Sequence, residues 1–154
     1  MKNTLIAMLI LALCAAPAFS QGMLKEREAT IVKAEGDVQV MIREEGAFKP
    51  AKEGMVLSEG DIIKTGPSGA ALLNIAGYAK GSLVRMRENT QLNLDILKED
   101  LGTNRKVTVL DVSIGKILIQ AEKLKEGSRF EVKTPTSVVG VRGTKFAVEV
   151  DTLE

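Results

Sequence analysis

The stretch Lys145-Phe146-Ala147-Val148-Glu149-Val150 carries the pattern that decides the fold. Its large apolar side chains stand at every second position and alternate with a lysine, an alanine and a glutamate. Successive side chains of a strand point to opposite faces, so a period of two indicates a strand with one face on a core. The stretch therefore predicts a half-buried β-strand.

The same period recurs outward from this stretch through most of the chain. Apolar residues alternate in four further runs: Val38, Val40 and Ile42; Leu92, Leu94 and Ile96; Ile117, Ile119 and Ala121; Phe130 and Val132. Turn residues such as Gly66-Pro67-Ser68-Gly69 separate the runs, and no long amphipathic helix is indicated. We therefore predict one all-β domain of about nine to eleven short strands, built as two twisted sheets packed face to face or as a short solenoid-like β-roll.

The N-terminus has the pattern of a secretory signal peptide. Lys2 is followed by an apolar run from Leu5 to Ala16, and Ala18-Phe19-Ser20 supplies small residues for cleavage. A membrane span needs about 20 apolar residues, and Pro17 ends this run short of that length. We predict cleavage after Ser20, no lipid on the cysteine of the leader, no integral membrane span in the mature chain, and a periplasmic or extracellular location.

The predicted organisation has four parts: a signal peptide at 1–20, a polar lead-in at 21–28, the β domain at 29–151 and a tail at 152–154. Removing the signal peptide also removes Lys2 and Cys14, which leaves 20 basic and 20 acidic residues. A chain with balanced charge has no basic footprint for nucleic acid, and neither nucleic acid nor an acidic membrane is an expected partner.

The residue inventory excludes several kinds of catalysis. The chain has no histidine, and its one cysteine lies in the predicted leader, so histidine-based triads and zinc sites built on these residues lack parts. We expect no cofactor and no metal. A small hydrolase using paired carboxylates stays open as a less favoured alternative.

Two segments are not explained by the alternation expected of a strand: Leu57 to Gly66 and Thr134 to Phe146. In the second, Arg142 lies among small and apolar residues, and an unpaired buried charge is very costly. We predict that Arg142 is buried and forms an ion pair with Asp61. The alternative is an anion or partner site beside Gly140 and Gly143, where missing side chains let another backbone approach.

These segments resemble the periplasmic FecR domain, named for the ferric-citrate regulator. The resemblance runs from about Thr30 to Val150 and rests on Gly36-Asp37-Val38, Leu57 to Gly66, Glu88-Asn89-Thr90 and Thr134 to Phe146. Full regulators of that family carry a cytoplasmic segment that holds a sigma factor, followed by a membrane helix. Here a signal peptide precedes the domain, so we expect a free-standing exported relative without a direct anti-sigma role.

The resemblance implies a non-catalytic binding or signalling module of the cell envelope. Its partner is expected to be an envelope protein or a cell-wall or polysaccharide component, and a structural envelope role is the alternative. The residues that we expect to form the structural motif are Gly60, Asp61, Thr65, Gly66, Thr134, Pro135, Gly140, Arg142, Gly143, Thr144 and Phe146.

Overall fold

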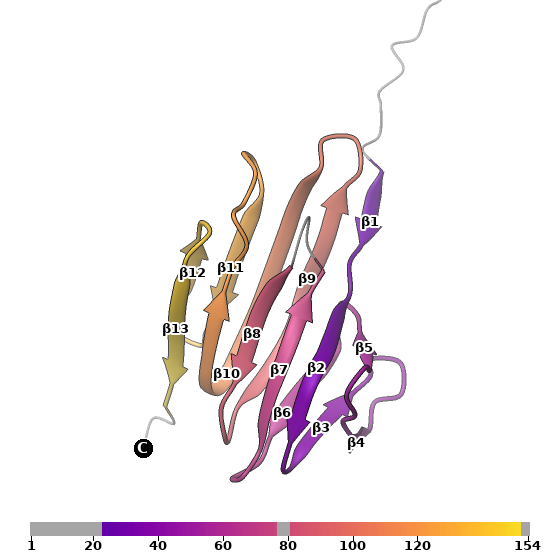
Figure 1. The fold of residues 1–154 in the computed structure, drawn as a ribbon, viewed down its shortest axis with the longest axis vertical. Coiled ribbons are helices and arrows are strands. Elements are labelled where there is room, and N and C mark those ends of the chain that lie inside the picture. Colours follow the sequence, from indigo (N-terminus) through magenta and orange to yellow (C-terminus); the bar gives the residue numbers. More distant parts are fainter. Residues whose placement is uncertain (1–22, 77–80, 152–154) are drawn as a thin grey trace, which may run out of the picture.

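The computed structural model describes residues 23–76 and 81–151, and these residues form strands and turns without a helix (Figure 1). The thirteen strands are β1 (Leu24–Glu26), β2 (Ala29–Glu35), β3 (Val38–Met41), β4 (Phe48–Pro50), β5 (Val56–Leu57), β6 (Ile62–Thr65), β7 (Ala70–Ile75), β8 (Ser82–Met86), β9 (Gln91–Asp100), β10 (Arg105–Gln120), β11 (Arg129–Lys133), β12 (Val138–Val141) and β13 (Lys145–Val150). The all-β prediction is confirmed. The strands outnumber the nine to eleven predicted because β1, β4 and β5 have only two or three residues and are too short to show a period.

The strands form one strongly curled sheet that resembles a half-barrel. Its main path runs β4-β3-β6-β9-β10-β8-β7-β2-β5, and β1, β11, β12 and β13 attach beside β9 and β10. Neighbouring strands are antiparallel except for β10 and β11, which are parallel. This pairing departs from a parallel solenoid and agrees with packed, largely antiparallel layers.

β10 is the strand on which the sheet folds over. Its residues from Arg105 to Ile114 pair with β9, whereas Ile117 to Gln120 pair with β8 on the same side. The β9 half therefore consists of β1, β4, β3, β6, β9, β11, β12 and the first part of β10. The β8 half consists of β5, β2, β7, β8, β13 and the last part of β10. Figure 1 shows β9, β6 and β3 behind β8, β7 and β2.

Both halves contribute to a single apolar core. The buried side chains of the β9 half include Val40, Ile63, Leu92, Leu94, Phe130 and Val132, and those of the β8 half include Ile31, Leu73, Ile75, Val84, Ile117 and Ile119. These residues stand at alternate positions of their strands, as the period of two predicts. The predicted face-to-face layers therefore occur as two halves of one sheet.

The fold-over of β10 depends on a glycine. Gly115 has φ +95°, and an added Cβ would lie 2.5 Å from the Cα of Thr90. A side chain at this position would be strained and would collide with backbone. The hydroxyl of Thr90 accepts a hydrogen bond from the Lys116 amide at 3.0 Å, which fixes the corner.

Gly115→Ala is therefore expected to lower the free energy of unfolding by about 2 kcal/mol, from backbone strain and the contact with Thr90. Denaturant unfolding followed by far-UV circular dichroism measures this loss. Gly140→Ala is the matched control, because Gly140 has no neighbour within 4 Å of an added Cβ. Equal losses in the two variants would contradict the role of Gly115.

The described part of the predicted lead-in is a strand. Leu24, Lys25 and Glu26 pair antiparallel with the end of β9, and all three residues are exposed. With neither face buried, the segment has no alternation that would reveal a strand. The predicted signal peptide and the tail at 152–154 lie outside the described residues, and the described part of the chain contains no helix that could cross a membrane.

Candidate functional site

The first unusual segment forms a turn that joins the two halves between β5 and β6. Asp61 is 4% exposed, and its carboxylate accepts hydrogen bonds from the amides of Arg43 at 2.9 Å and Ser58 at 2.8 Å. Gly60 has φ +91°, and its amide donates to the Leu94 carbonyl at 2.6 Å. Asp61 and Gly60 therefore hold backbone, and each carboxylate oxygen of Asp61 accepts from a backbone amide.

Thr65 and Gly66 form a second corner, at the opposite end of β6. The Thr65 hydroxyl donates to the Arg87 carbonyl at 2.5 Å and accepts from the Thr90 amide at 3.0 Å. The Gly66 amide donates to the Asp37 carbonyl at 2.8 Å. The motif residues in this segment thus have a structural role, because they bond the neighbouring turns of the curled sheet to one another.

The second unusual segment contains the hairpin between β11 and β12. The Thr134 amide donates to the Ser137 carbonyl at 2.8 Å, and the Ser137 amide donates to the Thr134 hydroxyl at 3.0 Å. Pro135 lies in the turn between them, where its missing N–H costs no ladder bond. The hairpin places β12 at the margin of the sheet, at the left of the view in Figure 1.

The prediction that Arg142 is buried and paired with Asp61 is wrong. Arg142 is exposed between β12 and β13, and no ion pair joins it to Asp61. The apolar run before it suggested an interior position, but β12 is an edge strand, and Val138 and Val139 remain 63% and 37% exposed. A strand without charged residues can lie at the exposed edge of a sheet, so its apolar sequence did not show that Arg142 is buried.

The rest of the segment turns the chain from β12 into β13. Gly143 has φ +66°, and an added Cβ would lie 3.0 Å from the Lys123 Cα. The Thr144 carbonyl accepts from the Ala121 amide at 3.2 Å, and half-buried Phe146 packs on the core. Gly143, Thr144 and Phe146 therefore have structural roles.

A buried ion pair does occur, but between other residues. Lys106 lies 3.2 Å from Glu122, and their side chains are 4% and 14% exposed. Burial lowers the pKa of Lys106, and the hydrogen bond and charge of Glu122 oppose that shift. Arg27, also buried, donates to the Thr108 hydroxyl nearby. Sequence reasoning missed this cluster because Lys106 follows Asn104 and Arg105 in a run that looks solvated.

The free side of β12 presents unpaired backbone. Thr134 and Ser137 form a hydrogen-bonded pair at the start of the β11–β12 ladder. In an antiparallel ladder, hydrogen-bonded and non-hydrogen-bonded pairs alternate. The N–H and C=O groups of Val138 and Gly140 therefore point away from β11. The side chain of Val139 lies on the same face of β12 as buried Val141. The edge is thus open to a further strand.

Gly140 has no function within this chain that requires glycine. Its φ is not positive, and no atom lies within 4 Å of an added Cβ. Glycine inside a strand often marks a position where another backbone approaches closely. The alternative interpretation of this segment as a partner site therefore has support at Gly140, although Gly143 serves the turn.

The other free edges among the described residues carry features that discourage pairing. β4 contains Pro50, β5 has two residues, and β1 and β13 carry charged side chains. Proline, shortness and charge are the usual protections of an edge strand. β12, with the sequence Val-Val-Gly-Val, has neither proline nor charge, and at four residues it is longer than β1, β4 and β5.

Comparison with known families places this edge within a recognised domain. Residues 61–153, more than half of the chain, match the family described as FecR protein. The chain belongs to the FecR protein family. The suspected resemblance is thereby confirmed, while its earlier part from Thr30 to Gly60 lies outside the matched residues. Comparison of this FecR chain with curated proteins and with solved structures finds no match.

The FecR match includes the β12 edge, the corner at Thr65 and Gly66, and Asp61, whereas Ser58 and Gly60 of the first turn lie before it. No group of three or more potential metal ligands occurs among the residues that the structure describes. In this FecR chain the β12 edge, formed by Val138–Val141 with the hairpin turn before it, is the candidate functional site.

Proposed function

We propose that this FecR-family protein is a non-catalytic, exported module of the cell envelope that binds an extended segment of an envelope protein. The segment adds a strand to the β12 edge. The observation that carries this proposal is an exposed edge strand without charge, proline or side-chain cover. In such strand addition, main-chain hydrogen bonds supply affinity and neighbouring pockets supply specificity.

A groove beside β12 supports the same interpretation. Its volume is about 610 Å³, and its lining includes Thr134, Pro135, Val139, Val148 and Val150. The groove thus extends from the hairpin turn to β13, next to the free edge. The same lining also includes polar residues such as Ser137 and Glu149, so a side chain of an added strand has a recess of mixed character within reach. A pocket of this size is within the range of binding sites.

Recognition of a polysaccharide has less support. Sugar rings commonly stack on exposed aromatic side chains, and Phe48 is the exposed aromatic residue among the described ones. The Lys64 ammonium lies 3.9 Å from the centroid of its ring, so one face of the ring is occupied. The protein partner is therefore the proposal, and glycan is an outcome that the test must distinguish.

Site-specific photo-crosslinking in the native envelope tests the proposal. A photoreactive residue at Val138 is expected to form one defined adduct with an envelope protein, whereas the same residue at exposed Val32 is not. A glycan adduct at Val138 would favour the wall-binding alternative, and an adduct with a second copy would indicate self-association. Equal labelling from both positions would overturn the edge as the site.

Val138→Lys is expected to lower the yield of that protein adduct at least tenfold when the photoreactive residue is moved to Val139. A lysine on an edge strand opposes pairing, and its charge would have to be desolvated by the partner. Val32→Lys is the matched control, since Val32 is also exposed and lies away from this edge. Both variants are expected to unfold at the wild-type denaturant concentration, and unchanged crosslinking in Val138→Lys would contradict strand addition.

Export is tested independently of binding. N-terminal sequencing of the mature protein is expected to begin at Gln21, because the apolar run ends in small residues just before it. A mature chain that keeps Met1, or one with lipid on Cys14, would contradict this part of the proposal.

A further inference from the structure

On the outer face of the β8 half, cationic and apolar side chains alternate along a row that crosses the strands. Strand register places Lys33, Leu72, Arg85, Leu118 and Ala147 side by side across β2, β7, β8, β10 and β13. Their chain neighbours on β7, β8 and β10 are buried, so these side chains point outward. Arg85 therefore lies between two leucines on a face that no other element of the described chain covers.

An apolar trough occupies one part of this face. Its volume is about 410 Å³, and its lining includes Leu72, Leu83, Leu118, Phe146 and Ala147. Small-molecule sites have volumes of about 300 to 1,000 Å³ and are mostly apolar, with a few polar groups that orient the ligand. The trough meets that description, with Arg85 among its lining residues.

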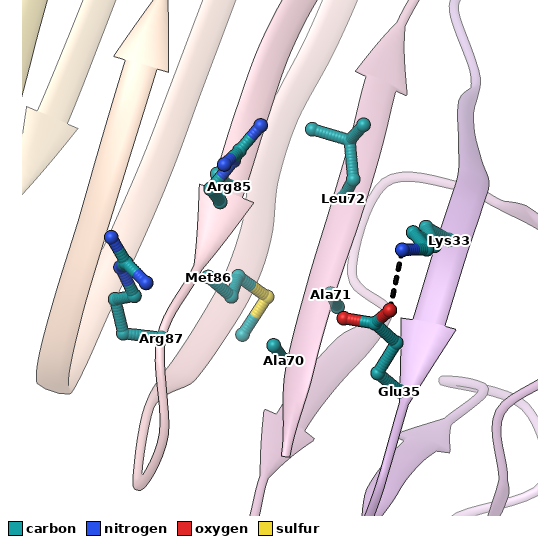
Figure 2. A pocket seen from close by; sticks show the side chains of 8 residues that line it. All are labelled: Lys33, Glu35, Ala70, Ala71, Leu72, Arg85, Met86 and Arg87. Carbon is teal, nitrogen blue, oxygen red and sulfur yellow. Dashed lines mark ion pairs between the residues drawn. The ribbon is translucent and has the colours of Figure 1, made fainter.

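A smaller cationic hollow of about 170 Å³ adjoins the trough and shares Leu72 and Arg85 with it (Figure 2). Figure 2 shows Arg85 and Arg87 on β8 and just after it, with Ala70 beside them and the paired Lys33 and Glu35 on the neighbouring side. Residues two apart in a strand point to the same face, about 7 Å apart. Both arginines line the hollow, and Figure 2 shows their side chains extending in different directions from it, so an anion would draw the two guanidinium groups together.

These arginines differ from two lysines of the same face, Lys33 and Lys116. Lys33 is paired with Glu35, and Lys116 lies 2.7 Å from Glu149. Among the described residues, no carboxylate lies within ion-pair distance of Arg85 or Arg87. Both guanidinium groups therefore lack a counter-charge from the described part of the protein, and an anion bound in the hollow would supply one.

The face as a whole carries an excess of positive charge. It presents five cations, Lys33, Arg85, Arg87, Lys116 and Lys145, against two carboxylates, Glu35 and Glu149, and a third, Glu53, at its β2 margin. The whole chain has a formal net charge of only +1. The fold therefore places an excess of positive charge on one face, although the composition of the chain is nearly balanced.

We propose that this face binds an anionic amphiphile, with its alkyl or acyl chain in the trough and its phosphate or carboxylate between Arg85 and Arg87. A wholly apolar ligand would cover Arg85 without a partner, which is costly. A simple anion would leave the trough empty, whereas guanidinium groups bind phosphate and carboxylate through paired N–H donors. Ala147 of β13 lines both this trough and the groove beside β12, whereas Arg85, Arg87 and the leucines of the trough line this site and not that groove.

Isothermal titration of the mature protein tests the proposal, with ligands kept below their micellar concentrations. Dodecyl phosphate or dodecanoate is expected to bind one to one, and the better of the two identifies the headgroup. Dodecyl maltoside, which lacks the charge, and butyl phosphate, which lacks the chain, are each expected to bind at least tenfold more weakly. Amide chemical shifts are expected to change on β7, β8 and the end of β10.

The variants Arg85→Gln and Arg87→Gln are each expected to weaken binding of the charged amphiphile at least tenfold. Leu118→Ser is expected to remove most of the advantage of dodecyl over butyl phosphate. Arg142→Gln is the matched control, because Arg142 is also exposed but lies outside this face. Equal binding of dodecyl maltoside, several ligands per chain, or undiminished affinity in both arginine variants would overturn the proposal.

Discussion

Replacement of Asp61 by alanine is expected to lower the free energy of unfolding by about 3 kcal/mol. The carboxylate accepts from the amides of Arg43 and Ser58, and the residue is almost fully buried. Its removal leaves two donors without an acceptor, and each such group costs about 1 to 3 kcal/mol. Domains are typically stable by only about 5 to 15 kcal/mol, so the loss is large. Denaturant unfolding measures it.

Two further variants show whether the amides are the reason. Asp61→Asn is expected to lose less than Asp61→Ala, because the amide oxygen still accepts one bond while its NH₂ group faces the other donor. Arg142→Gln is expected to change stability by less than about 0.5 kcal/mol, as an exposed substitution does. If Arg142→Gln were as damaging as Asp61→Ala, the ion pair that the structure lacks would have to be reconsidered.

The fold class was predictable because alternation is a local property. Runs such as Phe130 with Val132 and Phe146 with Val148 follow directly from strands with one buried face. The fold-over of the sheet was not predictable, since it depends on which half of β10 pairs with β9 and which with β8. Pairing of distant strands leaves no signal in a single sequence.

The candidate site was predictable only in part, because the absence of charge in a run of residues has two structural explanations. The sequence singled out the segment from Thr134 to Phe146, but an uncharged run such as Val138 to Val141 occurs equally in a buried strand and in an unprotected edge. The position of β12 in the sheet decides between these two. The face around Arg85 likewise appears only when register places Leu72 and Leu118 beside it.

The buried pair of Lys106 and Glu122 should behave as one unit. Glu122→Leu leaves the Lys106 ammonium buried near Arg27 and is expected to lower stability by about 3 kcal/mol, the usual cost of breaking a buried pair from one side. Lys106→Met leaves a carboxylate that is partly exposed, so its loss should be smaller. The double variant should be less damaged than the sum of the singles, with a coupling of at least about 1 kcal/mol.

The dependence of stability on pH gives this cycle a second readout. Burial holds the pKa of Lys106 in the folded protein below its ordinary value of 10.5. Between these two values the unfolded chain binds more protons than the folded one. The contribution of Lys106 to stability therefore rises with pH in that window. Glu122 raises the pKa of Lys106, so Glu122→Leu should lower that pKa further and extend the rise to lower pH. Lys106→Met should abolish this contribution. Additive losses, or a rise that persists unchanged in Lys106→Met, would show that the two side chains do not act together.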